Sequence, residues 1–456
     1  MRFTEKAFLY WGILLVLGAL GCSPKISEVV SPAEEQVSFS DGGEAEMPDR
    51  WWTAFEEPVL NELMEEGLGA NFDLQTAWYR FREAEAIKKR AASLLFPFLE
   101  GSANAEIFSP ESSLGNSEQF QAGLLAHYEI DLWGRMRSSV DAERFRTRAS
   151  FLDYQTAALT VSAEIVRTWL GLAEAREQVE ITTSQVETNT KVLELIKSRF
   201  GSGQLRHVDM LRQEQLLEAT RERHIQAEAR VQVLENQLAV LLGRAPREDL
   251  ALATGTLPEP PPLPETGLPV DLVQRRPDVQ SAFERLRASD RDLASAISNQ
   301  YPRLTLSASL SSASNNADAL FDSWVRSFAG NLLAPLFYGG QLRAEVKRSE
   351  AIKQQQVYIY GQSVLTAFRE VEDALIRERK QQEAVESVAR QLSLAHRANE
   401  QLRVAYFNGM GSYLEVLTAL DEEQQLQRDL LTEKLILLEY RVALYRALAG
   451  GFETGE

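Results

Sequence analysis

The sequence is poor in the residue types that form disulfide frameworks and metal centres. Its 456 residues contain one cysteine and four histidines. A single cysteine excludes an internal disulfide. The histidines, at positions 127, 207, 224 and 396, show no paired spacing with cysteine or acidic residues that would hold a metal ion. We therefore expect no metal site and no cofactor. The chain also lacks a catalytic constellation, so we expect it not to be an enzyme.

Positive charge is also scarce in this chain. There are 48 Lys and Arg residues against 66 Asp and Glu residues, which gives a net charge of −18. Such an excess of negative charge is repelled by phosphate backbones and by anionic membrane surfaces. We expect no nucleic-acid partner.

The apolar run at the N-terminus is too short to cross a membrane as a helix. It extends from Ala7 to Leu20 and follows the basic residues Arg2 and Lys6, whereas a spanning helix needs roughly 20 residues. This layout predicts a secretory signal peptide over residues 1–21. Cys22, directly after small Gly21, resembles the bacterial lipobox, which implies a lipidated mature N-terminus. An ordinary signal peptide with a chance cysteine is the alternative.

The rest of the sequence is a tandem duplication. After a polar tether predicted over residues 22–50, residues 71–99 recur as residues 276–304. The repeated positions include Asp73, Gln75, Ala77, Arg80 and Arg82, which return as Asp278, Gln280, Ala282, Arg285 and Arg287. Such a unit is far longer than a solenoid repeat. We expect a first structural repeat over residues 51–256, a proline-rich linker over 257–270 and a second repeat over 271–450.

Each repeat contains two segments in which apolar and polar residues alternate. The predicted strands cover about residues 99–108 and 120–131 in the first repeat, and about 303–312 and 324–336 in the second. Alternation over about ten residues fits a strand that spans a bilayer. It also fits a half-buried soluble hairpin; the secretion signal and Cys22 favour the membrane.

Each repeat then turns helical over a long distance. We predict helices over about residues 137–200 and 207–242, and over about 342–406 and 413–448. In the first long helix a heptad seam runs through Phe151, Ala158, Ile165, Leu172, Val179, Val186, Leu193 and Phe200. In the second, six of the eight equivalent positions are apolar or aromatic, with Glu378 and Asn399 as the exceptions. A seam of this length predicts coiled-coil packing, in a helix roughly 95 Å long at 1.5 Å per residue.

Four amphipathic strands cannot close a membrane barrel by themselves. Small membrane barrels need at least eight strands, and an open strand edge in lipid leaves backbone groups without hydrogen bonds. Either the strands are soluble or several chains share one barrel. Sharing predicts an oligomer with a water-filled lumen, which is a conduit.

The chain resembles the TolC-type outer-membrane efflux proteins, specifically the lipidated OprM/NodT-like branch. The segments that carry the resemblance are Trp51 to Pro58, Tyr128 to Arg135, Leu272 to Asp278, Pro302 and Tyr406 to Leu417. The resemblance implies an α+β membrane protein, a homotrimer with a 12-stranded barrel in outer-membrane lipid and a 12-helix periplasmic tunnel. It also implies two partners, a periplasmic adaptor protein and an inner-membrane pump.

The two helical turns are the candidate working sites. Gly203 and Gly409 are predicted to form the turns, because a helix reversal favours a residue free to take positive φ. The resemblance implies that these tips contact the adaptor and that Asp209 and Glu415 lie at the periplasmic gate, where a trimer would form rings of acid. Alternatively, both acids solvate a helix face or balance Arg206 and Arg212. Gly201–Gly203 also resembles the start of a phosphate loop, but it follows a helix rather than a strand.

The favoured function is the exit duct of a tripartite efflux pump, passively conducting drugs or other small solutes across the outer membrane. One alternative is the outer-membrane duct of a protein-secretion system. The other is a structural coiled-coil lipoprotein with no pore, although a spacer has no need of the alternating strand segments.

Overall fold

The structure, a computed structural model, describes residues 39–108, 117–246, 256–267, 269–449 and 452. The predicted signal peptide, Cys22 and much of the predicted tether lie outside the described residues. The chain divides into two compact units. A sheet unit contains Arg80–Phe151 and Ser281–Gln362; a helical unit contains Glu34–Tyr79, Leu152–Gln280 and Ser363–Glu456. Each unit takes segments from both sequence repeats, so the repeats are not the compact units.

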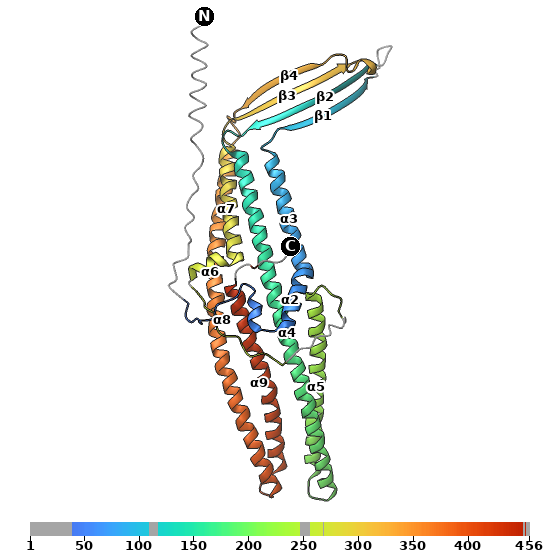
Figure 1. Cartoon of the computed structure of the whole chain (residues 1–456), viewed down its shortest axis with the longest axis vertical. Coiled ribbons are helices and arrows are strands. Elements are labelled where there is room, and N and C mark those ends of the chain that lie inside the picture. Colours follow the sequence, from blue (N-terminus) through green and yellow to red (C-terminus); the bar gives the residue numbers. More distant parts are fainter. Residues whose placement is uncertain (1–38, 109–116, 247–255, 268, 450–451, 453–456) are drawn as a thin grey trace. The chain divides into compact units, whose positions relative to one another are not determined.

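The sheet unit contains one four-stranded antiparallel sheet in the order β1-β2-β3-β4 (Figure 1). Its strands are β1 (Phe98–Phe108), β2 (Ser117–Ile130), β3 (Arg303–Ser314) and β4 (Val325–Leu333). The prediction for the last strand is too long, because β4 ends at Leu333 rather than at 336. Pro335 follows, and proline has no N–H to donate to a strand ladder.

The register places most apolar side chains on one face of the sheet. Leu99 pairs with Ala126, Ala126 with Ala308, and Ala308 with Phe328. Directly paired residues point to the same side of a sheet. The next row along, starting at Phe98, brings His127 and Ser307 together on the opposite face. Leu99 and Phe328 are 70% and 75% exposed, so the apolar face is uncovered in a single chain.

Both edges of the sheet lack a strand neighbour among the described residues. β1 pairs only with β2, and β4 pairs only with β3. An edge strand presents unpaired N–H and C=O groups that can pair with another chain. One chain therefore presents two strand edges that further copies can extend.

Two very long helices dominate the rest of the chain. α4 (Arg135–Gly201) and α8 (Gln341–Phe407) have 67 residues each, which is about 100 Å at 1.5 Å per residue. In the helical unit α4 runs beside the returning α5 (His207–Leu241), and α8 runs beside α9 (Tyr413–Leu448) (Figure 1). No helix within the described residues combines the length and the apolar character needed to cross a membrane.

The shorter helices precede the strands in each repeat. They are the 3-10 helix η1 (Trp51–Phe55), α2 (Pro58–Ala70) and α3 (Phe72–Ser93) in the first repeat, and α6 (Pro269–Arg275) and α7 (Pro277–Ser298) in the second. Trp51 and Met64 are fully buried in the core of the helical unit with Ile165 and Leu238. The indole N–H of Trp51 donates to Ser162, 3.2 Å away, so its polar atom is satisfied inside the core.

A polar residue joins the end of α5 to the start of α3. The Asn71 side-chain oxygen accepts hydrogen bonds from the backbone N–H groups of Asp73 and Leu74, and its amide donates to the Leu241 carbonyl at 2.9 Å. Gly243, two residues after the end of α5, has φ of 74°. A Cβ added there would lie 2.5 Å from the Ala70 carbonyl oxygen. Only glycine permits this close approach.

The equivalent position in the second repeat has different chemistry. Arg276 precedes α7 and forms ion pairs with Asp278 at 2.7 Å and with Glu370 at 2.8 Å. Burial by itself would lower the pKa of Arg276, but the two carboxylates outweigh it and the pKa is raised. A charge this buried is tolerated because it is paired.

The heptad seam predicted for α4 is only partly correct. Ile165 and Leu172 are fully buried as predicted, but Val179 and Val186 are half-exposed. From that level on, the buried side of α4 includes the polar residues Gln178, Thr182, Gln185 and Asn189. Hydrogen bonds to α9 explain the difference: the Asn189 and Gln424 amides bond each other at 3.1 and 3.2 Å, and the Gln185 amide donates to the Gln424 carbonyl at 3.0 Å.

Candidate functional site

The two helical turns have the same backbone structure. Gly203 and Gly409 both have φ of 74°, the conformation that the sequence predicts for them. In each turn the glycine N–H and the following N–H donate back to the last turn of the helix, from Gly203 to Phe200 at 2.9 Å and from Gln204 to Arg199 at 3.0 Å. The bonds from Gly409 and Met410 repeat this pattern at 3.1 and 2.8 Å. This Schellman arrangement satisfies helix-end carbonyls that would otherwise lack partners.

Asp209 is buried in the first turn of α5 and is neutralised within its own chain. It is 3% exposed. The Arg206 guanidinium donates to both carboxylate oxygens at 3.1 Å, and Arg212 lies 3.9 Å away. The positive end of the helix dipole also favours a carboxylate at this position. These contacts agree with the alternative prediction, in which Asp209 balances the charges of Arg206 and Arg212.

Glu415 lies in the first turn of α9 and belongs to a capping box. Its carboxylate accepts from the Ser412 N–H at 2.8 Å, while the Ser412 hydroxyl accepts from the Glu415 N–H at 3.4 Å. The reciprocal bonds satisfy two N–H groups at the start of the helix. Glu415 is exposed and has no ion pair among the described residues. The two predicted gate acids therefore differ, since one is paired and buried while the other keeps an uncompensated charge.

The two hairpins touch each other near their turns. The Arg199 guanidinium lies 4.8 Å from the ring centre of Phe407 and 5.6 Å from that of Tyr406, within the range of cation–π attraction. The Tyr413 hydroxyl donates to the Gln213 side chain at 2.5 Å, and the Gln213 amide donates to the Asn189 carbonyl at 3.1 Å.

These contacts hold the two turns of one chain together. Burial raises the pKa of Tyr413, and Tyr406 and Asp209 raise it further, so this phenol stays protonated and donating. The patterns in the sequence did not indicate a role for Arg199, Gln213 or Tyr413. The available signals were Arg199, four residues before Gly203, and Tyr413, four residues after Gly409.

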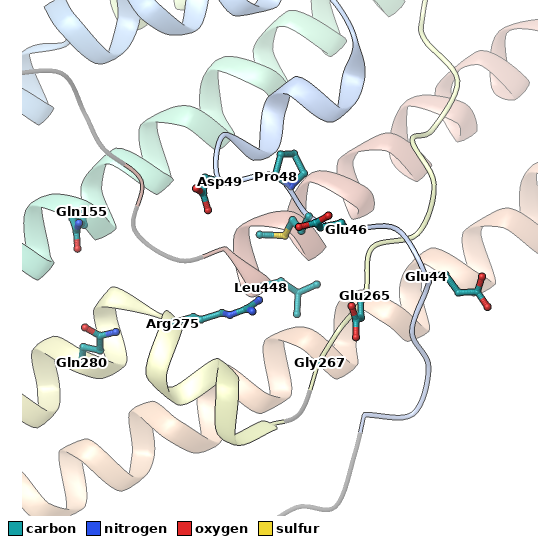
Figure 2. Close-up of a pocket in the computed structure, with 11 residues that line it drawn as sticks. Glu44, Glu46, Pro48, Asp49, Gln155, Glu265, Gly267, Arg275, Gln280 and Leu448 are labelled. Atoms are coloured by element: carbon teal, nitrogen blue, oxygen red, sulfur yellow. The ribbon is translucent and has the colours of Figure 1, made fainter.

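One hollow of the helical unit is lined by several acidic residues (Figure 2). Its volume is about 750 Å³, and its lining includes four carboxylates, from Glu44, Glu46, Asp49 and Glu265. Figure 2 shows Arg275 extending toward Leu448 among them. Across the described residues, no group of three His, Cys, Asp or Glu side chains is arranged to hold a metal ion.

A sheet with an exposed apolar face and paired long helices in the same chain are typical of an outer-membrane channel. The solved structure of the outer-membrane channel OprN matches this fold with a TM-score of 0.86 at 28% identity, over 94% of this chain and 99% of that one. A family model described as outer membrane efflux protein matches residues 63–244 and 268–450. The chain belongs to the outer membrane efflux protein family.

Curated relatives match over nearly their full length. The pyoverdine export outer membrane protein OpmQ of Pseudomonas putida is 31% identical, covering 96% of this chain and 97% of the relative. The solvent efflux pump outer membrane protein SrpC of Pseudomonas putida is 29% identical, covering 97% and 98%. The TolC-type resemblance is thereby confirmed. Assignment to the lipidated branch, which depends on Cys22, stays a prediction.

Proposed function

We propose that this chain is the outer-membrane exit duct of a tripartite efflux pump and passively conducts small solutes. The single observation that carries the proposal is the sheet, whose apolar face is exposed and whose two edges have no strand neighbour within the described part of the chain. Such a surface is stable in lipid only when further strands extend both edges. OpmQ and SrpC, which are named for pyoverdine export and solvent efflux, support an efflux role.

Three copies would satisfy these edges. Three four-stranded sheets supply the strands of a 12-stranded barrel, and three pairs of helical hairpins supply a 12-helix periplasmic tunnel. In this assembly β4 of one copy pairs with β1 of the next. Acyl chains on Cys22 would add a second attachment to outer-membrane lipid, since stable anchoring takes more than one weak signal.

The turns centred on Gly203 and Gly409 are the proposed gate and adaptor contact. Met410 is 76% exposed and Leu211 is 48% exposed, which gives the turns apolar surface for a partner. Asp209 and Glu415 would each form a ring of three acids in the trimer. Because Arg206 already neutralises Asp209, we assign most of the cation preference of the closed turn to Glu415.

Conductance of the purified protein in a planar bilayer tests the proposal. We expect pores that prefer cations, and a smaller preference in Glu415→Gln than in the unchanged protein. The Glu415→Gln substitution removes the charge but keeps the structure of the turn, because a glutamine side chain can still accept the Ser412 N–H in the capping box. Asp209→Asn should change the preference less. A protein that forms no pores, or a native mass measurement that finds only monomers in detergent, contradicts the duct.

A further inference from the structure

A second hollow of the helical unit is lined by arginines. Its volume is about 390 Å³, and it lies between α8 and α9 with one residue from α4. The four arginines in its lining are Arg167, Arg369, Arg377 and Arg446. The volume lies within the range of small-molecule sites.

Helical spacing places the charged residues on one side of the hollow, and small side chains leave its space open. Arg369, Asp373 and Arg377 follow at intervals of four along α8, so their side chains share one face of the helix. Ala374 of α8 and Ala443 and Ala447 of α9 also line the hollow. These methyl side chains leave open the space that larger residues would fill between two packed helices.

The charges in the hollow are not balanced. Four guanidinium groups and two carboxylates, those of Glu370 and Asp373, line the hollow. Glu370 is already paired with Arg276 at 2.8 Å, and Arg167 interacts with Glu164 and Glu439 outside the lining. Among the described residues, Arg369, Arg377 and Arg446 have no ion pair. The excess of positive charge is unusual for a chain whose net charge is −18.

One arginine also leaves a buried donor unused. Arg167 is paired only loosely, with Glu164 at 3.5 Å. Its Nε is buried and has no hydrogen-bond partner within the described part of the chain. A buried donor without a partner costs free energy, and a bound acceptor would remove that cost.

We propose that this hollow binds a small oxyanion, a molecule that carries phosphate or carboxylate groups. Guanidinium groups present paired N–H donors that match the two oxygens of either group. Arg369 and Arg377 supply two such forks from one helix face, and Arg167 and Arg446 supply two more from the other helices. The site lies in one chain and requires neither the pore nor the pump, so it stands apart from the proposed duct.

Isothermal titration of the purified full-length protein in detergent tests the site with two probes, inorganic pyrophosphate and citrate. We expect one probe molecule per chain and binding that weakens as salt is raised. Each of Arg369→Gln and Arg377→Gln should weaken binding by about tenfold or more, because a hydrogen bond to a charged group is lost. Arg397→Gln, at an exposed position of the same helix outside the hollow, should bind as the unchanged protein does.

A second variant separates the hollow from general surface charge. Ala443→Leu keeps every arginine but fills the space, and it should also abolish binding. Binding of pyrophosphate alone assigns the site to phosphates, and binding of citrate alone assigns it to carboxylates. The proposal is overturned if neither probe binds, as would happen if an acidic side chain of a second copy occupies the hollow. It is equally overturned if Ala443→Leu and the two arginine variants bind as well as the unchanged protein.

Discussion

Gly203 and Gly409 act through backbone conformation rather than packing. Both have φ of 74°, and nothing lies within 4 Å of a Cβ added at either position. A side chain at these positions therefore meets open space, and only the left-handed backbone opposes it. That conformation costs roughly 1–2 kcal/mol for most residues other than glycine.

We predict that Gly203→Ala destabilises the first turn by about 1 kcal/mol, whereas Gly203→Asn costs less because asparagine tolerates this conformation. Gly243→Ala should cost more, because its Cβ would also collide with the Ala70 carbonyl. Hydrogen exchange of the amides at the turn measures the first effect, and thermal unfolding measures the second. Equal costs at positions 203 and 243 would contradict the distinction.

His396 provides a pH-dependent contact between α8 and α9. Its Nδ1 lies 2.7 Å from a Glu423 oxygen, and this hydrogen bond, with the charges of Glu423 and Glu400, raises the pKa of His396 above 6.5. The folded state thus binds the proton more tightly than the unfolded state. Its stabilising effect is complete below the unfolded pKa and is lost as pH rises through the raised folded value.

We predict that Glu423→Gln returns the pKa of His396 toward its ordinary value, while Glu400→Gln changes it less. NMR titration of histidine-labelled protein measures both. An unchanged pKa in Glu423→Gln would show that the contact does not persist in solution.

At the scale of elements, helices α8 and α9 are joined by a buried ion pair. The Arg441 guanidinium contacts both oxygens of Glu378, and the side chains of these residues are only 6% and 9% exposed. Arg441 also donates to the Pro261 carbonyl of the linker. Glu378 is one of the polar exceptions in the second heptad seam, and this partner explains its burial.

We predict that Arg441→Met lowers the free energy of unfolding by about 3–5 kcal/mol, since it leaves a buried carboxylate unpaired. The double variant Arg441→Met with Glu378→Met should lose much less, because no charge remains buried. Chemical denaturation followed by circular dichroism compares the two. A double variant less stable than Arg441→Met would refute this account.

The sequence was informative wherever a pattern repeats within one element. Alternation located the four strands, and heptads with breaker glycines located the long helices to within a few residues. Contacts between elements were not predictable in this way. The partial exposure of Val179 and the burial of Asn189 depend on which face of α4 packs against α9. The periodicity of the sequence alone does not determine which face that is. The neutralisation of Asp209 was predictable as an alternative because Arg206 and Arg212 lie within one helical turn of it.

At the scale of the whole molecule, the two faces of the sheet should differ sharply in their tolerance of charge. Leu306 pairs with Tyr128 and Gly330 on the apolar face, whereas Ser307 pairs with His127 on the other. We predict that Leu306→Arg lowers the yield of assembled protein in outer-membrane fractions, at a cost of roughly 2–4 kcal/mol if the position lies near the bilayer midplane. Ser307→Arg is the matched control and should assemble normally. Equal yields of the two variants would count against a lipid-facing sheet.

The buried side of α4 is polar between Gln178 and Asn189 and apolar before and after that level, which varies the strength of the contact between the two hairpins. Separating a leucine from its partners exposes apolar surface to water, at a cost of about 1.5–3 kcal/mol per side chain. Parting Asn189 from Gln424 exchanges one set of hydrogen bonds for another set with water, at a net cost of about 0.5–1.5 kcal/mol each. The seam is therefore firm at Ile165 and Leu172 and weakest at the polar level around Asn189. Near the turns it is firm again, because Ile196 is buried and the Tyr413 hydroxyl donates to Gln213. Separating the two hairpins costs least midway along their length.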